Sequence, residues 1–214
     1  MGYKYILGEM SLKYFTKDWY KEMQISGFVK FIESIEEWEE MEKEYKQSLK
    51  EELLKFLPES LHPYIHNNTI NSECPLDKLK KFLLEWNEDY EKRITHLDQS
   101  YIEHFNFIKK NLPSNVIQLH EFSLHDSDVL SAERTSKDTL TIFLDCSGTF
   151  SDFDKLQVTF TGVTKCSMPE NFEGAWWLYH EIELTEDGFE LGVLFDCPFK
   201  EVIICAEDVQ IEKG

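Results

Sequence analysis

The residues best suited to chemistry lie in a short acidic segment, Leu124-His125-Asp126-Ser127-Asp128. An imidazole nitrogen and one or two carboxylates can bind a divalent cation. The acidic loop that carries Asp152 and Asp154 could add further oxygen ligands. The pattern therefore predicts a divalent metal site formed by His125, Asp126, Asp128, Asp152 and Asp154, which would support hydrolysis or the binding of a small ligand.

The same segment has a second, purely structural interpretation. In a regular strand His125 and Asp126 point to opposite faces, so a bulge or turn would be needed to bring three side chains together. Otherwise Asp126 or Ser127 is expected to cap a turn through backbone N–H groups. No other cofactor is expected, because the sequence has no Gly-rich phosphate loop, no nucleophile elbow and no zinc-finger spacing.

A second candidate site lies on a hairpin in the segment WWLYHEIELTEDGFELGVLF. Asp187-Gly188 predicts a two-residue turn, which pairs Leu184 with Leu191 and gathers the apolar side chains on one face. The opposite face would combine aromatic and acidic side chains: Trp177, Tyr179, Glu181 and Glu183. Such a face is expected to bind a basic protein partner.

The charge distribution favours the same kind of partner. The formal net charge is −19, and residues 113–214 carry −14 of it, with 6 Lys/Arg against 20 Asp/Glu. An acidic surface repels nucleic acid and anionic lipid, so neither is expected as a partner. The favoured function is a non-enzymatic protein-binding module of the inhibitor or immunity type, and the alternative is a metal-dependent hydrolase. The oligomeric state is not indicated.

The spacing of apolar residues changes near Pro113 from helical to strand-like. Before it, the pattern predicts a short helix from Thr16 that ends at Gly27, and a second helix over 34–56. The longest helix should lie between Pro75 and Pro113, where an apolar pattern repeats every eleven residues over about 35 residues.

After Pro113 the pattern predicts seven or eight short strands between about Val116 and Ile211, in an antiparallel sandwich or rolled sheet. The expected fold class is α+β, with a helical domain over 1–112 and an acidic all-β domain over 113–214. The N-terminus lacks a signal-peptide pattern and no apolar run approaches ~18 residues, so a cytoplasmic location is expected.

Several motifs resemble a family of uncharacterised proteins from Bacillus and related Firmicutes, catalogued only as a domain of unknown function. They are SLKYFTKDWY, FLPESLHPYIHNNTINS, LHDSDV, TFTGV and EGAWWLYHEIELTEDGFELGVLF. The resemblance begins near Met10, so residues 1–9 could be an extension. It implies a bacterial cytoplasmic protein with a helical-plus-β architecture, and it supplies no activity, cofactor or site residue.

Overall fold

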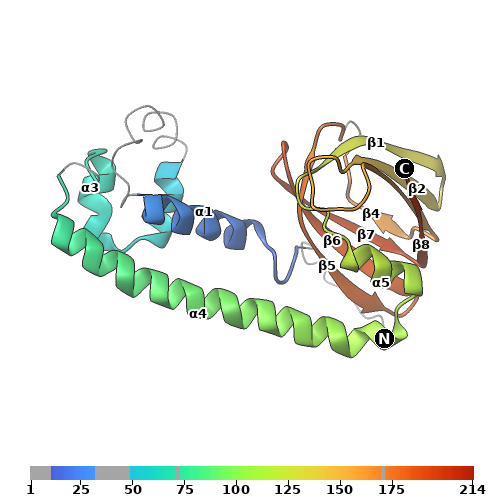
Figure 1. Ribbon diagram of the computed structural model, residues 1–214, viewed down its shortest axis with the longest axis horizontal. Coiled ribbons are helices and arrows are strands. Elements are labelled where there is room, and N and C mark those ends of the chain that lie inside the picture. The colour runs from blue at the N-terminus through green and yellow to red at the C-terminus, as the bar shows by residue number, and fades with distance from the viewer. Residues whose placement is uncertain (1–10, 32–48, 71–72, 170–171) are drawn as a thin grey trace, which may run out of the picture. The chain divides into compact units, whose positions relative to one another are not determined.

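A computed structural model of the protein describes residues 11–31, 49–70, 73–169 and 172–214 (Figure 1). The chain forms two compact units. One contains the chain up to Lys17 together with residues 100–214, and the other contains residues 18–99. The boundary thus falls at residue 99 instead of 112, and the N-terminal segment belongs to the β unit.

The long helix is present as predicted. α4 (Leu76–Ile108) has 33 residues and continues into the 3₁₀ turn η3 (Lys109–Asn111). Three residues spaced eleven apart, Leu79, Tyr90 and Tyr101, are each at most 6% exposed, so the repeat does mark one buried stripe. The stripe serves a hydrophobic core in each unit, because Leu79 belongs to one core and Phe105 to the other.

The helical unit contains α1 (Lys17–Phe31) from Asp18 onward, a helical stretch over 49–56, η2 (Glu59–Leu61) and α3 (His62–His66). The predicted end of the first helix at Gly27 was wrong. A glycine inside a helix costs only about 1 kcal/mol, so α1 continues for another turn. Most of the predicted second helix lies outside the described residues.

The β unit confirms the α+β class. A helix, α5 (Ser114–Glu121), precedes β1 (Ser127–Ser136), β2 (Thr139–Asp145), β3 (Lys155–Thr161), β4 (Lys165–Cys166), β5 (Trp176–Thr185), β6 (Gly188–Asp196), β7 (Lys200–Ala206) and β8 (Asp208–Lys213). All strands join one antiparallel sheet in the order β4-β7-β6-β5-β1-β2-β3-β8. The strand expected near Val116 is instead α5, because Pro113 precedes a helix in which Val116 and Leu119 lie one turn apart and are fully buried.

The sheet is rolled. Phe160 of β3 and Phe189 of β6 have ring centroids 6.4 Å apart, although four strand spacings of about 4.8 Å would separate them in a flat sheet. Val116 and Leu119 belong to the same core. Their helix, α5, lies next to the sheet (Figure 1). The outer face is the one opposite this core.

The predicted hairpin exists, but its loop and register differ from the prediction. Thr185 pairs with Gly188, so Glu186 and Asp187 form the loop, and Ile182 pairs with Leu191. Gly188 has a φ of 143°, a value that favours glycine, and it lies just after the loop instead of in it. Because the shift equals two residues, the side chains between the loop and residue 179 keep their predicted faces.

A β-bulge between Trp177 and Tyr179 changes the faces beyond that point. The extra residue turns Trp177 into the core, where it is 0% exposed, and leaves Trp176 on the outer face at 48% exposure. The prediction that Trp177 belongs to the same face as Tyr179 and Glu181 was therefore wrong.

Candidate functional site

The outer face of β5, β6 and β7 is covered by the chain's own N-terminal segment, residues 11–17, called here the N-terminal strap. Glu181 of β5 holds it through its main chain. Glu181 Oε1 accepts the backbone N–H of Lys13 at 2.6 Å, and Oε2 accepts those of Tyr14 and Phe15 at 2.8 and 3.2 Å. Glu181 is 4% exposed, and burial raises the pKa of its carboxyl although the three N–H groups act in the opposite direction.

A second carboxylate holds both ends of the same segment. Glu201 of β7 accepts the backbone N–H of Leu12 at 3.2 Å and that of Lys17 at 2.9 Å. Two acidic side chains thus accept five backbone N–H groups of a segment that forms no strand with the sheet. Hydrogen bonds to ionised acceptors are about twice as strong as neutral ones.

The strap's side chains add specific contacts. Leu12, 2% exposed, packs over Gly192 of β6 so closely that a Cβ added there would lie 2.3 Å from Leu12 Cδ2. Lys13 Nζ lies 2.9 Å from Glu183 Oε1, and His104 Nε2 lies 2.8 Å from Glu183 Oε2. The face predicted to await a partner is therefore occupied by this strap.

The rings of the strap contact the rings beneath it in tilted and edge-to-face arrangements. Tyr14 and Phe15 each have a ring centroid 5.1 Å from that of Tyr101, and Phe15 lies 5.7 Å from Tyr179. Aromatic pairs at these distances stabilise a contact beyond the area they bury. Tyr179 is thus an aromatic of the outer face, as predicted, and its contact here is with the chain itself.

A different set of outer-face residues remains accessible beyond the bulge. Trp176 of β5 stands opposite Asp196 of β6 on one side and Asp128 of β1 on the other, and Asp128 stands opposite Asp145 of β2. Directly paired residues share a face, so the four side chains form one row across four strands, called here the Trp176 row. No cation of the described residues forms an ion pair with Asp128 or Asp196, and hydrogen bonds from Ser147 lower the pKa of Asp145.

A buried polar network links β5 to Tyr101 of α4 and His120 of α5. Trp177 Nε1 donates to His180 Nδ1 at 3.2 Å, and the Tyr101 hydroxyl accepts the Ile182 N–H at 3.1 Å and lies 3.3 Å from His120 Nδ1. Burial lowers the pKa of His180 to about 3 and that of His120 to about 4. Both imidazoles are therefore neutral at pH 7 and serve the packing of the core.

The HDSD segment forms a turn. The Ser127 N–H bonds to the Leu124 carbonyl at 3.0 Å, and Asp126 has a positive φ of 67°. His125 Nδ1 lies 3.0 Å from Asp126 Oδ1, and its ring lies 5.0 Å from that of Tyr179. The segment is thus a turn with a local histidine contact, and the Ser127 hydroxyl donates to Cys146 Sγ at 3.5 Å instead of to a backbone acceptor.

The remaining predicted metal ligands have other surroundings. Asp128 belongs to the Trp176 row, and Asp152 Oδ1 lies 3.2 Å from Lys213 Nζ. Asp154 is exposed next to the start of β3. Within the described part of the chain, no group of three or more His, Cys, Asp or Glu side chains could hold a metal ion. The five predicted ligands are thus not brought together.

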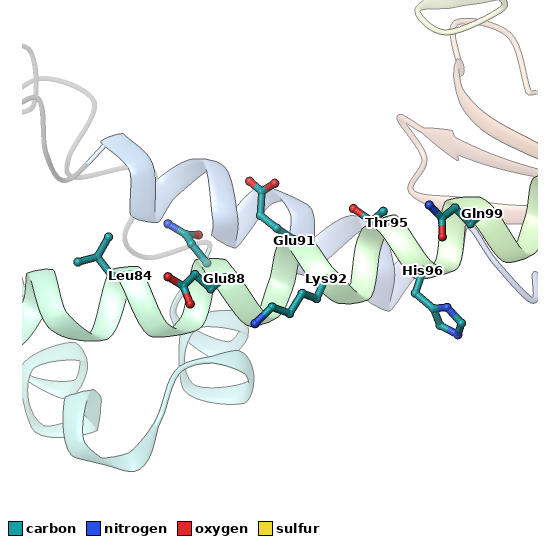
Figure 2. A pocket seen from close by; sticks show the side chains of 8 residues that line it. Leu84, Glu88, Glu91, Lys92, Thr95, His96 and Gln99 are labelled. Carbon is teal, nitrogen blue, oxygen red and sulfur yellow. The ribbon is translucent and has the colours of Figure 1, made fainter.

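An open groove of about 680 Å³ lies along α4 in the helical unit (Figure 2). Among its lining residues are the ionisable side chains of Glu88, Glu91, Lys92 and His96. Figure 2 shows these side chains leaving successive turns of the helix in different directions. They do not converge on one point, as a catalytic set must.

Neither the strap nor the exposure of Trp176 was predicted from the sequence. Glu181, which was predicted to contact a basic partner, is a buried acceptor within the chain, and its three donors lie more than 160 residues away. Trp177 was assigned to the outer face in place of Trp176, because a run of apolar residues does not indicate where a β-bulge occurs.

Two comparisons with known proteins bear on the resemblance of the motifs. No curated protein matches the chain. None of the helices in the described segments is both long and apolar enough to span a membrane. A family model, described as a protein of unknown function (DUF4085), matches residues 14–206 and so covers both units and the Trp176 row. The chain therefore belongs to the DUF4085 family of proteins of unknown function.

Proposed function

We propose that this protein is a non-enzymatic binding module of the inhibitor or immunity type, which captures a basic segment of another protein on the Trp176 row. The observation that carries the proposal is an exposed indole with a carboxylate on either side of it in one row. Asp196, Trp176, Asp128 and Asp145 follow each other on adjacent strands. This replaces the predicted face, most of which the N-terminal strap covers.

The spacing of the row suits a cationic side chain. Adjacent strands lie about 4.8 Å apart, and a cation within about 6 Å of an indole centroid is attracted to the ring face. An arginine of a partner that stacks on Trp176 would therefore have Asp128 and Asp196 within reach on either side. A planar guanidinium can use both contacts at once, so arginine is expected to bind better than lysine.

The overall charge supports the same partner class. Residues 113–214 carry a formal charge of −14, which steers basic surfaces toward this unit and raises their association rate. The alternative function, a metal-dependent hydrolase at the HDSD segment, has less support because its expected ligands are apart. The binding module is the function that the geometry favours.

A capture experiment with paired variants tests the proposal. Immobilised wild-type protein is expected to retain a basic protein saturably from a lysate of the source organism at 50 mM salt. Trp176→Ala and Asp128→Asn should each weaken retention at least tenfold, since each removes one half of the cation site. Retention should also fall steeply at 300 mM salt, because the contact is largely electrostatic.

Matched controls distinguish specific binding at the Trp176 row from non-specific binding through negative charge or exposed aromatic residues. Phe150→Ala removes an aromatic side chain that is 99% exposed elsewhere in the unit, and Glu133→Gln removes an exposed carboxylate. Neither should change retention. Equal retention by Trp176→Ala and the wild type, or loss in the controls alone, would refute the assignment.

A further inference from the structure

We infer that the N-terminal strap is an internal pseudo-ligand, and that the outer face of β5, β6 and β7 also binds a peptide segment of another protein with the same chemistry. That chemistry is an apolar side chain, then a lysine, then two aromatic residues, as in Leu12, Lys13, Tyr14 and Phe15. The inference concerns a separate surface and does not depend on the Trp176 row.

The main-chain contacts are of a kind that a foreign segment can reproduce. Glu181 and Glu201 bind backbone N–H groups, which every non-proline residue provides. The described strap residues add no strand to the sheet, so no ladder of main-chain bonds needs to be broken for an exchange. Another peptide in an equivalent conformation could present the same donors to the same carboxylates.

The side-chain contacts define which segment fits. The absence of a side chain at Gly192 leaves the depression that Leu12 fills, so the first position should be a medium-sized apolar residue. Glu183 forms an ion pair with Lys13, so the second residue of a competing peptide should be basic. The rings of Tyr101 and Tyr179 receive Phe15, which selects an aromatic residue.

The strap has an advantage over any free peptide because it is tethered. Because the strap belongs to the same chain as the face, its docking is intramolecular and does not pay the entropy of bringing two molecules together. The face is therefore closed to weak competitors as long as the strap is docked. A change that weakens docking of the strap without touching the face should open it.

The test uses the full chain and a fluorescent synthetic peptide that spans residues 10–18. Leu12→Asp in the protein removes the apolar anchor of the strap but leaves Glu181, Glu183 and Gly192 intact. We expect this variant to bind the peptide at least tenfold more tightly than the wild type does, measured by fluorescence anisotropy. Backbone amides 13–15 of the variant should exchange hydrogen faster, because they are released from Glu181.

A second substitution in the Leu12→Asp protein identifies the acceptor. Glu181→Gln should reduce peptide binding at least tenfold, since an amide presents only one acceptor oxygen. Glu212→Gln, the same change at an exposed position of β8, should leave it unchanged. A peptide with aspartate in place of its leucine should not bind.

Lys13→Glu provides an independent route if Leu12→Asp fails to fold, because the Lys13 side chain is 62% exposed and its loss leaves no cavity. It repels Glu183 and should likewise tighten peptide binding. Equal affinity of the wild type and of the folded strap variants would overturn the inference. So would binding that persists undiminished in the Glu181→Gln protein.

Discussion

The indole Nε1 of Trp177 donates a hydrogen bond to Nδ1 of His180 across 3.2 Å in the core of the β unit. This bond requires an unprotonated Nδ1, so the neutral imidazole must carry its proton on Nε2. That atom is buried and has no hydrogen-bond partner among the described residues. The core thus depends on a histidine that cannot take up a second proton without losing the bond.

Acid should therefore destabilise the protein through His180 and His120. Their folded-state pKa values, about 3 and about 4, lie below the ordinary value of 6.5. Between pH 6.5 and 4 the unfolded chain binds more protons than the folded one, so the free energy of unfolding falls as the pH falls. Each histidine contributes a slope of up to about 1.4 kcal/mol per pH unit.

Urea unfolding at pH 7, 6, 5 and 4.5 measures this slope. His180→Gln should flatten it by the contribution of one group, and His66→Gln, at an exposed position, should not. Burial raises the pKa of Glu181, which has the opposite effect on stability near pH 4.5, but that effect is common to all three proteins. An unchanged slope in His180→Gln would contradict the prediction.

Tyr101→Phe should destabilise the β unit by about 1–3 kcal/mol. The substitution removes the hydroxyl that accepts the Ile182 N–H and leaves a buried donor unsatisfied. Tyr64→Phe, a half-exposed tyrosine of the helical unit, is the control and should change stability by less than about 0.5 kcal/mol. Chemical denaturation of both variants, followed by circular dichroism, gives the comparison.

Two glycines with positive φ should respond differently to alanine. At Gly188, with φ 143°, a Cβ would lie 2.2 Å from the Ala206 carbonyl oxygen, so Gly188→Ala should cost at least about 3 kcal/mol. Gly174 has φ 77° and open space around it, so Gly174→Ala should cost only about 1–2 kcal/mol. Thermal melts of the two variants would contradict this account if their losses were equal.

The stabilisation that Arg93 gives the helical unit should depend on the forked geometry of its guanidinium. Arg93 Nη1 and Nη2 bind the two carboxylate oxygens of Glu22 at 2.9 and 2.6 Å, and Nε binds Asp89 at 2.9 Å. Arg93→Lys loses the fork and should cost about 0.5–1 kcal/mol, with a smaller effect in 1 M NaCl. Lys81→Ala breaks the looser 3.9 Å pair with Glu85 and should be nearly neutral in the same unfolding assay.

Much of the fold could be predicted where periodicity is uninterrupted. The eleven-residue repeat located α4, and three residues of that repeat, Leu79, Tyr90 and Tyr101, are buried. The predicted hairpin register was wrong because the glycine of an Asp-Gly pair can lie inside the loop or directly after it. α5 was missed because eight residues are too few for helical and strand patterns to separate.

The candidate sites were harder to predict because they depend on contacts distant in sequence. The bulge that exchanges Trp177 for Trp176 has no local signal in a run of aromatic and apolar residues. The burial of Glu181 depends on a segment at the other end of the chain. Tyr179, Glu181 and Glu183 do share one face of the sheet. That the N-terminal strap covers this face could not be inferred from the sequence.

The two edges of the sheet bear on how copies of this protein meet at high concentration. An exposed edge strand is a template for pairing with another chain, which leads to aggregation. Here one edge is β4, which is only two residues long, and the other is β8, which carries Glu212 and Lys213 next to the C-terminus. A short strand and a charged strand both resist such pairing, so the fold itself discourages fibril-like stacking.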